Sequence, residues 1–289
     1  MGRLERILNK ADNFKEAGRF EEALKELTKA VKIAPHDPDV YSSFALTYDA
    51  MGEFETSVFY FRKALELGPR DSYIWTQFGI TLSRMGRFKY AFDAFQKALT
   101  IEPDYIVAKW NLALTYKAIG YYEDAISEFM KCMQLESDSA YADEIHYQLG
   151  LCYFDMGWTK EALREFKSQV KTFPDDVWAH YSIGNCYLDF GWIDESIAIY
   201  KKIISACPDF VPAYNSLAFS MAEKGWYDEA LDVLRTALQI APEDESIKDS
   251  MDYIQSLKDD EDGFKGLMLF SLLLQILNKR QILKNAVNP

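Results

Sequence analysis

The chain has 289 residues, of which 49% are hydrophobic, which is ample for a substantial core. It carries 45 acidic and 32 basic residues, a formal net charge of −13, and its pI is about 4.8. This acidic balance argues against non-specific binding to nucleic acid, which needs lysine and arginine side chains facing the phosphates. It suits solubility and a basic protein partner.

Glycine and proline recur at a fixed interval of 34 residues. The glycines are Gly18, Gly52, Gly86 and Gly120, then Gly157, Gly191 and Gly225, and the prolines are Pro35, Pro69 and Pro103, then Pro174, Pro208 and Pro242. A period of this size is typical of stacked repeat architectures. Alignment on the glycines gives seven blocks: residues 4–37, 38–71, 72–105, 106–139, 143–176, 177–210 and 211–244.

Each block contains two helical patterns of about a dozen residues with the glycine between them, which predicts a helix–turn–helix unit. The eighth residue of the first helix is always small: Ala11, Ala45, Gly79, Ala113, Gly150, Gly184 and Ala218. A small residue in the second helix is followed four residues later by a large one: Leu27, Phe61, Phe95, Phe129, Phe166, Tyr200 and Leu234. Small residues where helices cross allow close approach, and a bulky side chain there would overpack.

The proline of each block is expected to end the second helix, and an acidic residue follows it where the next helix begins. These residues are Asp37, Asp71, Asp104, Asp175, Asp209 and Glu243. Aspartate is well suited to cap a helix or to lie near its positive end.

The order Trp/Tyr-x-x-Leu-Gly-x-x-Tyr, then Gly, Ala, Phe, Ala and Pro, resembles the tetratricopeptide repeat over residues 4 to 244. The resemblance implies an all-α, right-handed superhelical solenoid. It also implies that the first helices line a concave groove that receives peptide segments.

Two departures from the pattern occur in the middle of the chain. Ser137 replaces the usual proline, and three extra residues, Ala140, Tyr141 and Ala142, separate the fourth block from the fifth. We expect a longer helix or a loop there, and a kink that divides four repeats from three. The twenty-seventh position, usually alanine, is Cys132, Gln169 and Ile203 in the fourth to sixth blocks, which predicts looser or differently spaced packing.

Three segments follow the seventh block. Residues 245–258 form an amphipathic pattern that predicts a helix capping the last exposed core, so that the solenoid covers residues 4–258. Residues 259–263 form an acidic linker, and residues 264–289 are expected to form an apolar C-terminal tail helix with four basic and no acidic residues.

Groove positions of the first helices become aromatic and apolar from the fourth block onward. The candidate peptide-binding residues are Trp110, Asn111, Leu114, Tyr147, Leu151, Phe154, Trp178, Tyr181, Asn185, Asn215 and Phe219. The aromatic residues would anchor a ligand and the asparagine amides would bind its backbone. Asp155, Asp189 and Glu223 recur beside them and predict an apolar ligand with Lys or Arg nearby. The alternative is that these side chains pack between successive first helices.

A carboxylate clamp for C-terminal peptides, as in chaperone-binding members of the family, would need Lys and Arg at groove positions of consecutive repeats. Arg84 and Lys117 are isolated, so the sequence argues against that mode. Three tryptophans follow the turn glycines, at Trp158, Trp192 and Trp226. We expect them to pack on the neighbouring turn, and a lateral contact ridge is the alternative.

No catalytic signature is present, and no cofactor or metal is expected. His146 and His180 occupy equivalent positions in neighbouring blocks, where a packing residue is usual, and no further ligand recurs beside them. The cysteines form no CxxC pair, and with no apolar N-terminal stretch they indicate a reducing, cytoplasmic location. We expect them to be buried small hydrophobic residues.

The apolar run from residue 267 to residue 277 is eleven residues long, too short to span a bilayer. It would dock on the same chain, insert into another copy to give a homo-oligomer, or attach shallowly to a membrane. The sequence thus predicts a non-catalytic scaffold or adaptor that binds a peptide or helix in its groove. The alternative is a self-assembling or membrane-peripheral structural protein driven by the apolar segment from Phe264 to Leu277.

Overall fold

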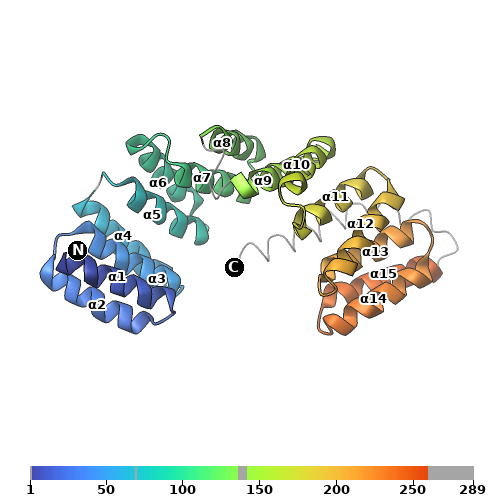
Figure 1. The fold of residues 1–289 in the computed structure, drawn as a ribbon, viewed down its shortest axis with the longest axis horizontal. Helices are drawn as coiled ribbons and strands as arrows, with labels where there is room; N and C mark the ends of the chain where they lie inside the picture. The colour runs from blue at the N-terminus through green and yellow to red at the C-terminus, as the bar shows by residue number, and fades with distance from the viewer. Residues whose placement is uncertain (1, 69, 136–141, 260–289) are drawn as a thin grey trace. The chain divides into compact units, whose positions relative to one another are not determined.

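The computed structural model describes residues 2–68, 70–135 and 142–259, and every regular element within these ranges is a helix (Figure 1). The helices are α1 (Arg3–Glu16), α2 (Phe20–Ile33), α3 (Pro38–Ala50), α4 (Phe54–Leu67), α5 (Ser72–Arg84), α6 (Phe88–Ile101), α7 (Ile106–Ala118), α8 (Tyr122–Leu135), α9 (Ala142–Asp155), α10 (Thr159–Thr172), α11 (Val177–Asp189), α12 (Ile193–Ala206), α13 (Val211–Glu223), α14 (Tyr227–Ile240) and α15 (Glu245–Asp259). The predicted all-α solenoid of helical hairpins is confirmed.

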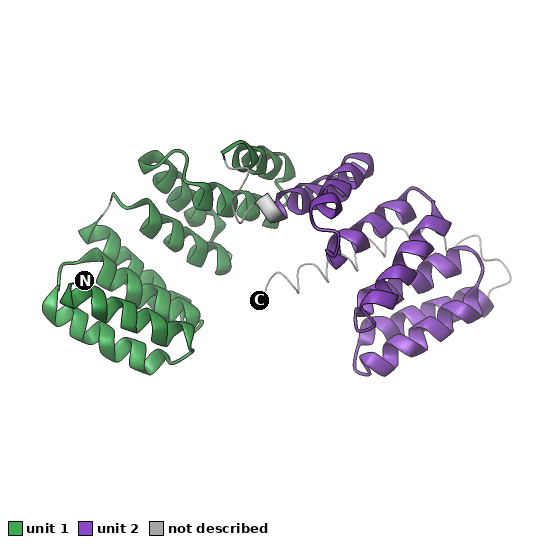
Figure 2. Cartoon of the chain, viewed as in Figure 1, with its two compact units in different colours: residues 1–141 green, residues 142–289 purple. Residues whose placement is uncertain are grey.

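The chain divides into two compact units, residues 1–141 and residues 142–289 (Figure 2). The first unit contains the hairpins α1–α2, α3–α4, α5–α6 and α7–α8, and the second contains α9–α10, α11–α12 and α13–α14, followed by α15. The division falls at the predicted insertion, where Ala140 and Tyr141 lie outside the described residues and Ala142 begins α9. Ser137, the acidic residues 260–262, Gly263 and the tail of residues 264–289 also lie outside them.

Each hairpin reverses at its glycine, as the period predicts. The seven repeating glycines have φ between 70° and 82°, a region that residues with a side chain rarely adopt. At Gly157, the glycine N–H donates to the Phe154 carbonyl at 2.9 Å and the Trp158 N–H donates to the Tyr153 carbonyl at 2.8 Å. This pair of bonds is the Schellman motif, which satisfies the last carbonyls of the first helix.

The small residue of each first helix lies against the large residue of its partner helix. A Cβ atom added to Gly150 would lie 2.5 Å from Phe166 Cε1, and one added to Gly184 would lie 2.6 Å from Tyr200 Cε1. The large residues Phe61, Phe95, Phe129, Phe166 and Tyr200 are all buried. In these two hairpins the helices therefore cross so closely that the position of the small residue has room only for the hydrogen atom of glycine.

Acidic caps begin several first helices, but they do not always lie at the predicted residue. The Asp37 carboxylate accepts from the Asp39 N–H at 2.9 Å, and Asp71 accepts from the Ile74 N–H at 2.9 Å. The cap of α11 is Asp176 rather than the predicted Asp175, and its Oδ1 accepts from the Ala179 N–H at 3.0 Å.

The same one-residue shift occurs before α15, where Asp244 rather than Glu243 accepts from the Ser246 N–H at 2.9 Å. No side-chain cap begins α7, where Asp104 instead binds Lys109 at 3.3 Å. The N-cap residue of α13 is Phe210 rather than Asp209, and it makes no side-chain cap. An acidic residue near a helix start is thus only a partial guide, because the chain path between proline and helix decides which side chain faces the free N–H groups.

A polar bond that the sequence did not predict ties each of three first helices to the preceding hairpin. Tyr41 Oη donates to the Pro35 carbonyl at 2.7 Å, and Tyr214 Oη donates to the Pro208 carbonyl at 2.8 Å. His180 Nε2 lies 2.8 Å from the Pro174 carbonyl, which can only accept, so Nε2 carries a proton. The fourth residue of the repeat therefore fixes the loop that contains the proline.

The departures at the twenty-seventh position are accommodated in the core. Cys132, Gln169 and Ile203 are all buried. The amide of Gln169 keeps a polar partner, since its Nε2 donates to Asp176 Oδ2 at 3.1 Å. The larger side chains thus fill the space between hairpins, and the glutamine adds a bond to the capping residue of α11.

The last hairpin is covered by α15, one residue longer at its end than predicted. Ile247 and Ile254 are fully buried in the cluster formed with α13 and α14. Ion pairs also link successive hairpins at their turns, between Lys224 and Asp194 and between Lys258 and Asp228. Because these pairs are exposed, each contributes at most about 1 kcal/mol.

The close contact at Gly150 gives a first prediction. Gly150→Ala should lower the free energy of unfolding by about 1–3 kcal/mol, because its methyl group would enter the space of Phe166. Guanidinium denaturation followed by circular dichroism measures the change. A second substitution, Phe166→Leu, should restore part of the lost stability, because it places alanine opposite leucine, as Ala11 and Leu27 are in the first repeat. An unchanged midpoint in the single variant would show that the two helices separate freely.

The cysteines give a second prediction. Cys132, Cys152 and Cys186 are buried, and burial raises the pKa of the Cys132 and Cys186 thiols to about 12. Because the thiolate is the reactive form, a thiol reagent at pH 8 should modify the half-buried Cys207 first and the others only after denaturant is added. Cys207→Ser should remove the fast phase. Rapid labelling of native Cys132 or Cys186 would contradict the packing.

Candidate functional site

The residues predicted to line a groove belong to both units, and each unit has its own face of first helices. In the first unit, Asn111 and Leu114 are half-buried on α7, and Trp110 is buried against Phe129 with ring centroids 5.0 Å apart. The second unit contributes the other eight: Tyr147, Leu151, Phe154, Trp178, Tyr181, Asn185, Asn215 and Phe219. They lie on α9, α11 and α13.

The aromatic residues of the second unit differ in how much surface they expose. Trp178 is 38% exposed, whereas Tyr181 and Phe219 expose only 8% and 3%. Tyr147, Leu151 and Phe154 are half-buried. Packing between helices, the alternative offered by the sequence, therefore accounts for most of the surface of Tyr181 and Phe219, and Trp178 offers the largest aromatic surface of the three.

A repeated tyrosine–serine bond joins the first helices of the second unit. Tyr181 Oη and Ser216 Oγ lie 3.0 Å apart, and Ser182, 34 residues before Ser216, interacts with the Tyr147 hydroxyl in the equivalent place. Burial raises the pKa of both tyrosines, and each bond to serine opposes that shift. These bonds hold α9, α11 and α13 in register, so the face that they form is preorganised.

The three asparagines predicted to bind a ligand backbone have different environments. Asn111 Nδ2 donates to the Val107 carbonyl of its own helix at 2.8 Å. Asn185 Oδ1 accepts from Tyr200 Oη at 2.7 Å. Asn215 Oδ1 is buried and makes no hydrogen bond within the described residues. Asn111 and Asn185 are thus partly engaged inside the fold.

Charge on the face of the second unit has a single sign. The charged residues at the groove positions of its repeats are Glu144, Asp155, Asp189 and Glu223. These positions are the second, fifth, sixth, ninth, twelfth and thirteenth of each repeat, and none of them holds Lys or Arg. Glu223 is half-buried, and this burial raises the pKa of its carboxyl group. A positively charged ligand group beside Glu223 would stabilise its ionised form.

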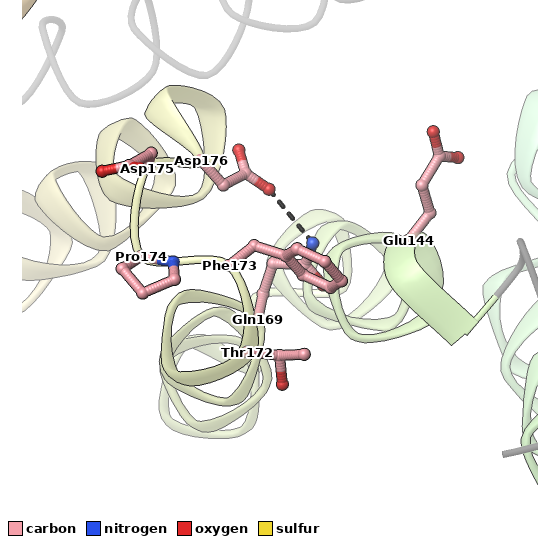
Figure 3. A pocket seen from close by; sticks show the side chains of 7 residues that line it. All are labelled: Glu144, Gln169, Thr172, Phe173, Pro174, Asp175 and Asp176. Carbon is pink, nitrogen blue, oxygen red and sulfur yellow. Dashed lines mark hydrogen bonds between the residues drawn. The ribbon is translucent and has the colours of Figure 1, made fainter. Parts of the chain in front are cut away.

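A pocket of about 490 Å³ lies at the edge of this face, where α9 begins and the loop between α10 and α11 passes (Figure 3). Its lining residues are Glu144, Gln169, Thr172, Phe173, Pro174, Asp175 and Asp176. The Asp176 carboxylate points at Gln169 Nε2, whereas Glu144 extends from α9 on the other side of the pocket (Figure 3). Sequence analysis missed this acidic pocket, although Glu144 at the second position and the Asp175–Asp176 pair were visible signals.

The tryptophans after the turn glycines are more exposed than predicted. Trp158, Trp192 and Trp226 expose 50%, 49% and 40% of their surface. Trp158 stacks on Tyr153 with centroids 6.0 Å apart, and Trp192 lies 5.6 Å from Tyr187. Each of these two indoles thus packs on the helix that precedes its own turn, and half of it remains open to solvent.

The two histidines have separate roles in packing. His146 Nδ1 lies 2.7 Å from Glu165 Oε2, and His180 binds the Pro174 carbonyl. Across residues 2–68, 70–135 and 142–259, no group of three or more His, Cys, Asp and Glu side chains could hold a metal ion. In the same ranges, every helix is too short or too polar to cross a membrane.

Comparison with known families supports the repeat assignment directly. Sequence models of the tetratricopeptide repeat match residues 14–76, and then residues 72–105, 107–139, 143–176, 179–210 and 211–244. The chain belongs to the tetratricopeptide repeat family. Comparison with curated proteins finds no match.

Solved structures of the family share the fold. A tetratricopeptide repeat protein from Parabacteroides merdae has a TM-score of 0.65 and 16% identity, covering 87% of this chain and 98% of its own. YrrB, described as a TPR protein with an unusual peptide-binding site, has a TM-score of 0.51 and 22% identity, covering 66% of this chain and 96% of its own. MamA has a TM-score of 0.52 and 28% identity, covering 61% and 94%.

The difference between Trp178 and Tyr181 gives a third prediction. Tyr181→Ala should cost about 3–5 kcal/mol of stability, because it empties a core site and removes the bond to Ser216. Trp178→Ala should cost less, about 1 kcal/mol, since part of the indole is already solvated. Guanidinium denaturation of the two variants compares them. The opposite order would contradict the assignment of Tyr181 to the core.

Proposed function

We propose that this tetratricopeptide repeat protein is a non-catalytic scaffold whose second unit binds an apolar segment that carries Lys or Arg. Proteins of this family generally mediate protein–protein interactions. The observation that carries the finer proposal is the face of α9, α11 and α13, where accessible apolar side chains lie among groove positions whose charged residues are all acidic.

The apolar part of this face consists of Trp178, Leu151, Phe154 and Leu188, all of which retain some exposure. Trp178 packs edge-on against Phe210, with ring centroids 4.8 Å apart, so its indole is held in place before a ligand arrives. Large, preordered aromatic residues are typical anchors of protein interfaces. The charges at the border would select for basic ligands and speed their association.

The size of the face sets the length of the ligand. Packed helices lie about 8–10 Å apart, so three first helices form a face about 20 Å wide. An extended segment advances at most about 3.3–3.6 Å per residue, so about six or seven residues would cross it. The pocket that includes Glu144 and Asp175 lies at its edge and would receive a lysine or arginine side chain. In the first unit, Trp110, Asn111 and Leu114 remain proposed contacts of a separate face.

A fourth prediction tests this binding with a defined probe. The probe is a fluorescein-labelled peptide of six apolar residues with two lysines at each end, and the comparison peptide has glutamates in place of the lysines. The lysine peptide should bind at least about tenfold more tightly, because the face is acidic, and added salt should weaken it. Fluorescence anisotropy with the full chain measures both affinities.

Matched tryptophan variants locate the binding site. Trp178→Ala should weaken binding of the lysine peptide about tenfold or more, as expected for loss of an aromatic anchor. Trp192→Ala removes a somewhat more exposed indole, 49% against 38%, from the turn of the same hairpin and should leave binding unchanged. Equal losses in the two variants, or no loss in Trp178→Ala, would contradict the proposed site.

A further inference from the structure

The charge of the chain is divided very unevenly along its length. Residues 1–141 contain 21 acidic and 18 basic residues, a net charge of −3, whereas residues 142–259 contain 21 and ten, a net charge of −11. Residues 264–289 contain four basic residues and no acidic one. The basic, apolar tail therefore complements the second unit far better than the first.

We propose that the tail of this same chain occupies the first-helix face of the second unit as an internal ligand and limits access of other segments to it. This inference rests on the proposed function, since it names an occupant for the same face. The tail lies outside the described residues, and its sequence, its point of attachment and the charge of the face carry the argument.

The composition of the tail fits what the face would bind. The run from residue 267 to residue 277 contains no charged residue, and only Ser271 and Gln275 are polar. Such a segment gains free energy by leaving water, at roughly 25 cal/mol per Å² of apolar surface buried. Lys265 precedes the run, and Lys279 and Arg280 follow it, so both of its ends are basic. This is the pattern of an apolar core with basic flanks that the accessible residues of α9 and α11 favour.

The tail is attached to the second unit, at the end of α15. The last described helix, α15, ends at Asp259 and packs against α13 as well as α14. Four residues, 260–263, then precede Phe264, and they span at most about 13–14 Å when extended. A helical segment of 14 residues would be about 21 Å long, close to the width of three first helices. From an attachment point on a helix that packs against α13, the tail has the length to cross α11 and reach α9.

The carboxylate of Glu223 marks one place for a basic residue of the tail. It lies at the end of α13, is half-buried, and forms no ion pair within the described residues. Burial of a charged group without a partner is unfavourable, so a lysine or arginine from the tail would stabilise it. Glu144 and Asp189 offer further exposed carboxylates on α9 and α11.

Tethering makes even weak docking effective. A short linker gives an effective concentration of about 1 mM, so a tail with an intrinsic Kd of about 10 µM would weaken a competing ligand roughly 100-fold. The scaffold would then bind only partners that displace the tail. Substitutions on the apolar side of the tail should therefore make the face accessible to other ligands without changing any residue of the face itself.

Photo-crosslinking of the full chain tests where the tail lies. With p-benzoylphenylalanine in place of Phe270, irradiation and peptide mass spectrometry should give links to α9, α11 or α13 within one chain, at a yield independent of protein concentration. The same amino acid in place of Phe59, which is 61% exposed on α4, is the control and should give no such links. Covalent dimers would indicate a second copy as the occupant and overturn the proposal. Links only to the first unit would overturn it too. The same holds if phosphatidylserine vesicles abolish the links and the chain then sediments with the vesicles.

Titration with the lysine peptide of the preceding section tests the consequence. Phe270→Asp with Leu274→Asp should increase peptide affinity at least about tenfold, because the tethered competitor is lost. Ser271→Asp with Gln275→Asp makes the same charge change on the polar side of the run and should leave affinity unchanged. Equal affinity in the wild-type chain and both variants would overturn the proposal while leaving the proposed function intact. Failure of the peptide to bind any variant would instead reject the proposed function, and the crosslinks would still report on the tail.

Discussion

The contact between a small residue of each first helix and a large residue of its partner helix sets the geometry on which the other features depend. Where the small residue is Gly150 or Gly184, the aromatic ring of Phe166 or Tyr200 lies directly against the backbone. One hairpin closed in this way buries one side of each helix and leaves the other side without a partner. Stacking on the next hairpin buries that second side, so the stability of each repeat depends on its neighbours.

Stacking also decides what the first helices can offer to a ligand. In the second unit, part of the aromatic surface is used to join α9, α11 and α13 through the bonds of Tyr147 and Tyr181 to serine. These residues make the face rigid, and Trp178 with the half-buried Leu151 and Phe154 supplies its accessible apolar surface. A rigid face loses less conformational entropy when it binds, which favours affinity for a segment that must itself become ordered.

Electrostatics gives this face its selectivity. The second unit carries most of the negative charge of the described chain, and its groove positions contain acidic residues without basic ones. Apolar surface alone would bind many segments, whereas a border of carboxylates favours those with lysine or arginine and disfavours acidic ones. The tail of the chain has that chemistry, and a protein that contains its own ligand can regulate access to its face without a second component.

The sequence by itself determined the repeat, its period, the turn glycines, the pairs of small and large residues and the capping helix, because each depends on contacts within one hairpin or with the next. It placed helix caps less accurately, since Asp176 rather than Asp175 faces the free N–H groups of α11. Only the tertiary structure decided which groove residues remain accessible. Tyr181 and Trp178 lie on the same helix, but the burial of Tyr181 depends on Phe210, in the loop that leads into α13, and on Ser216, which belongs to the following hairpin. Exposure is a property of the stacked neighbours, so a helical pattern read within one repeat cannot supply it.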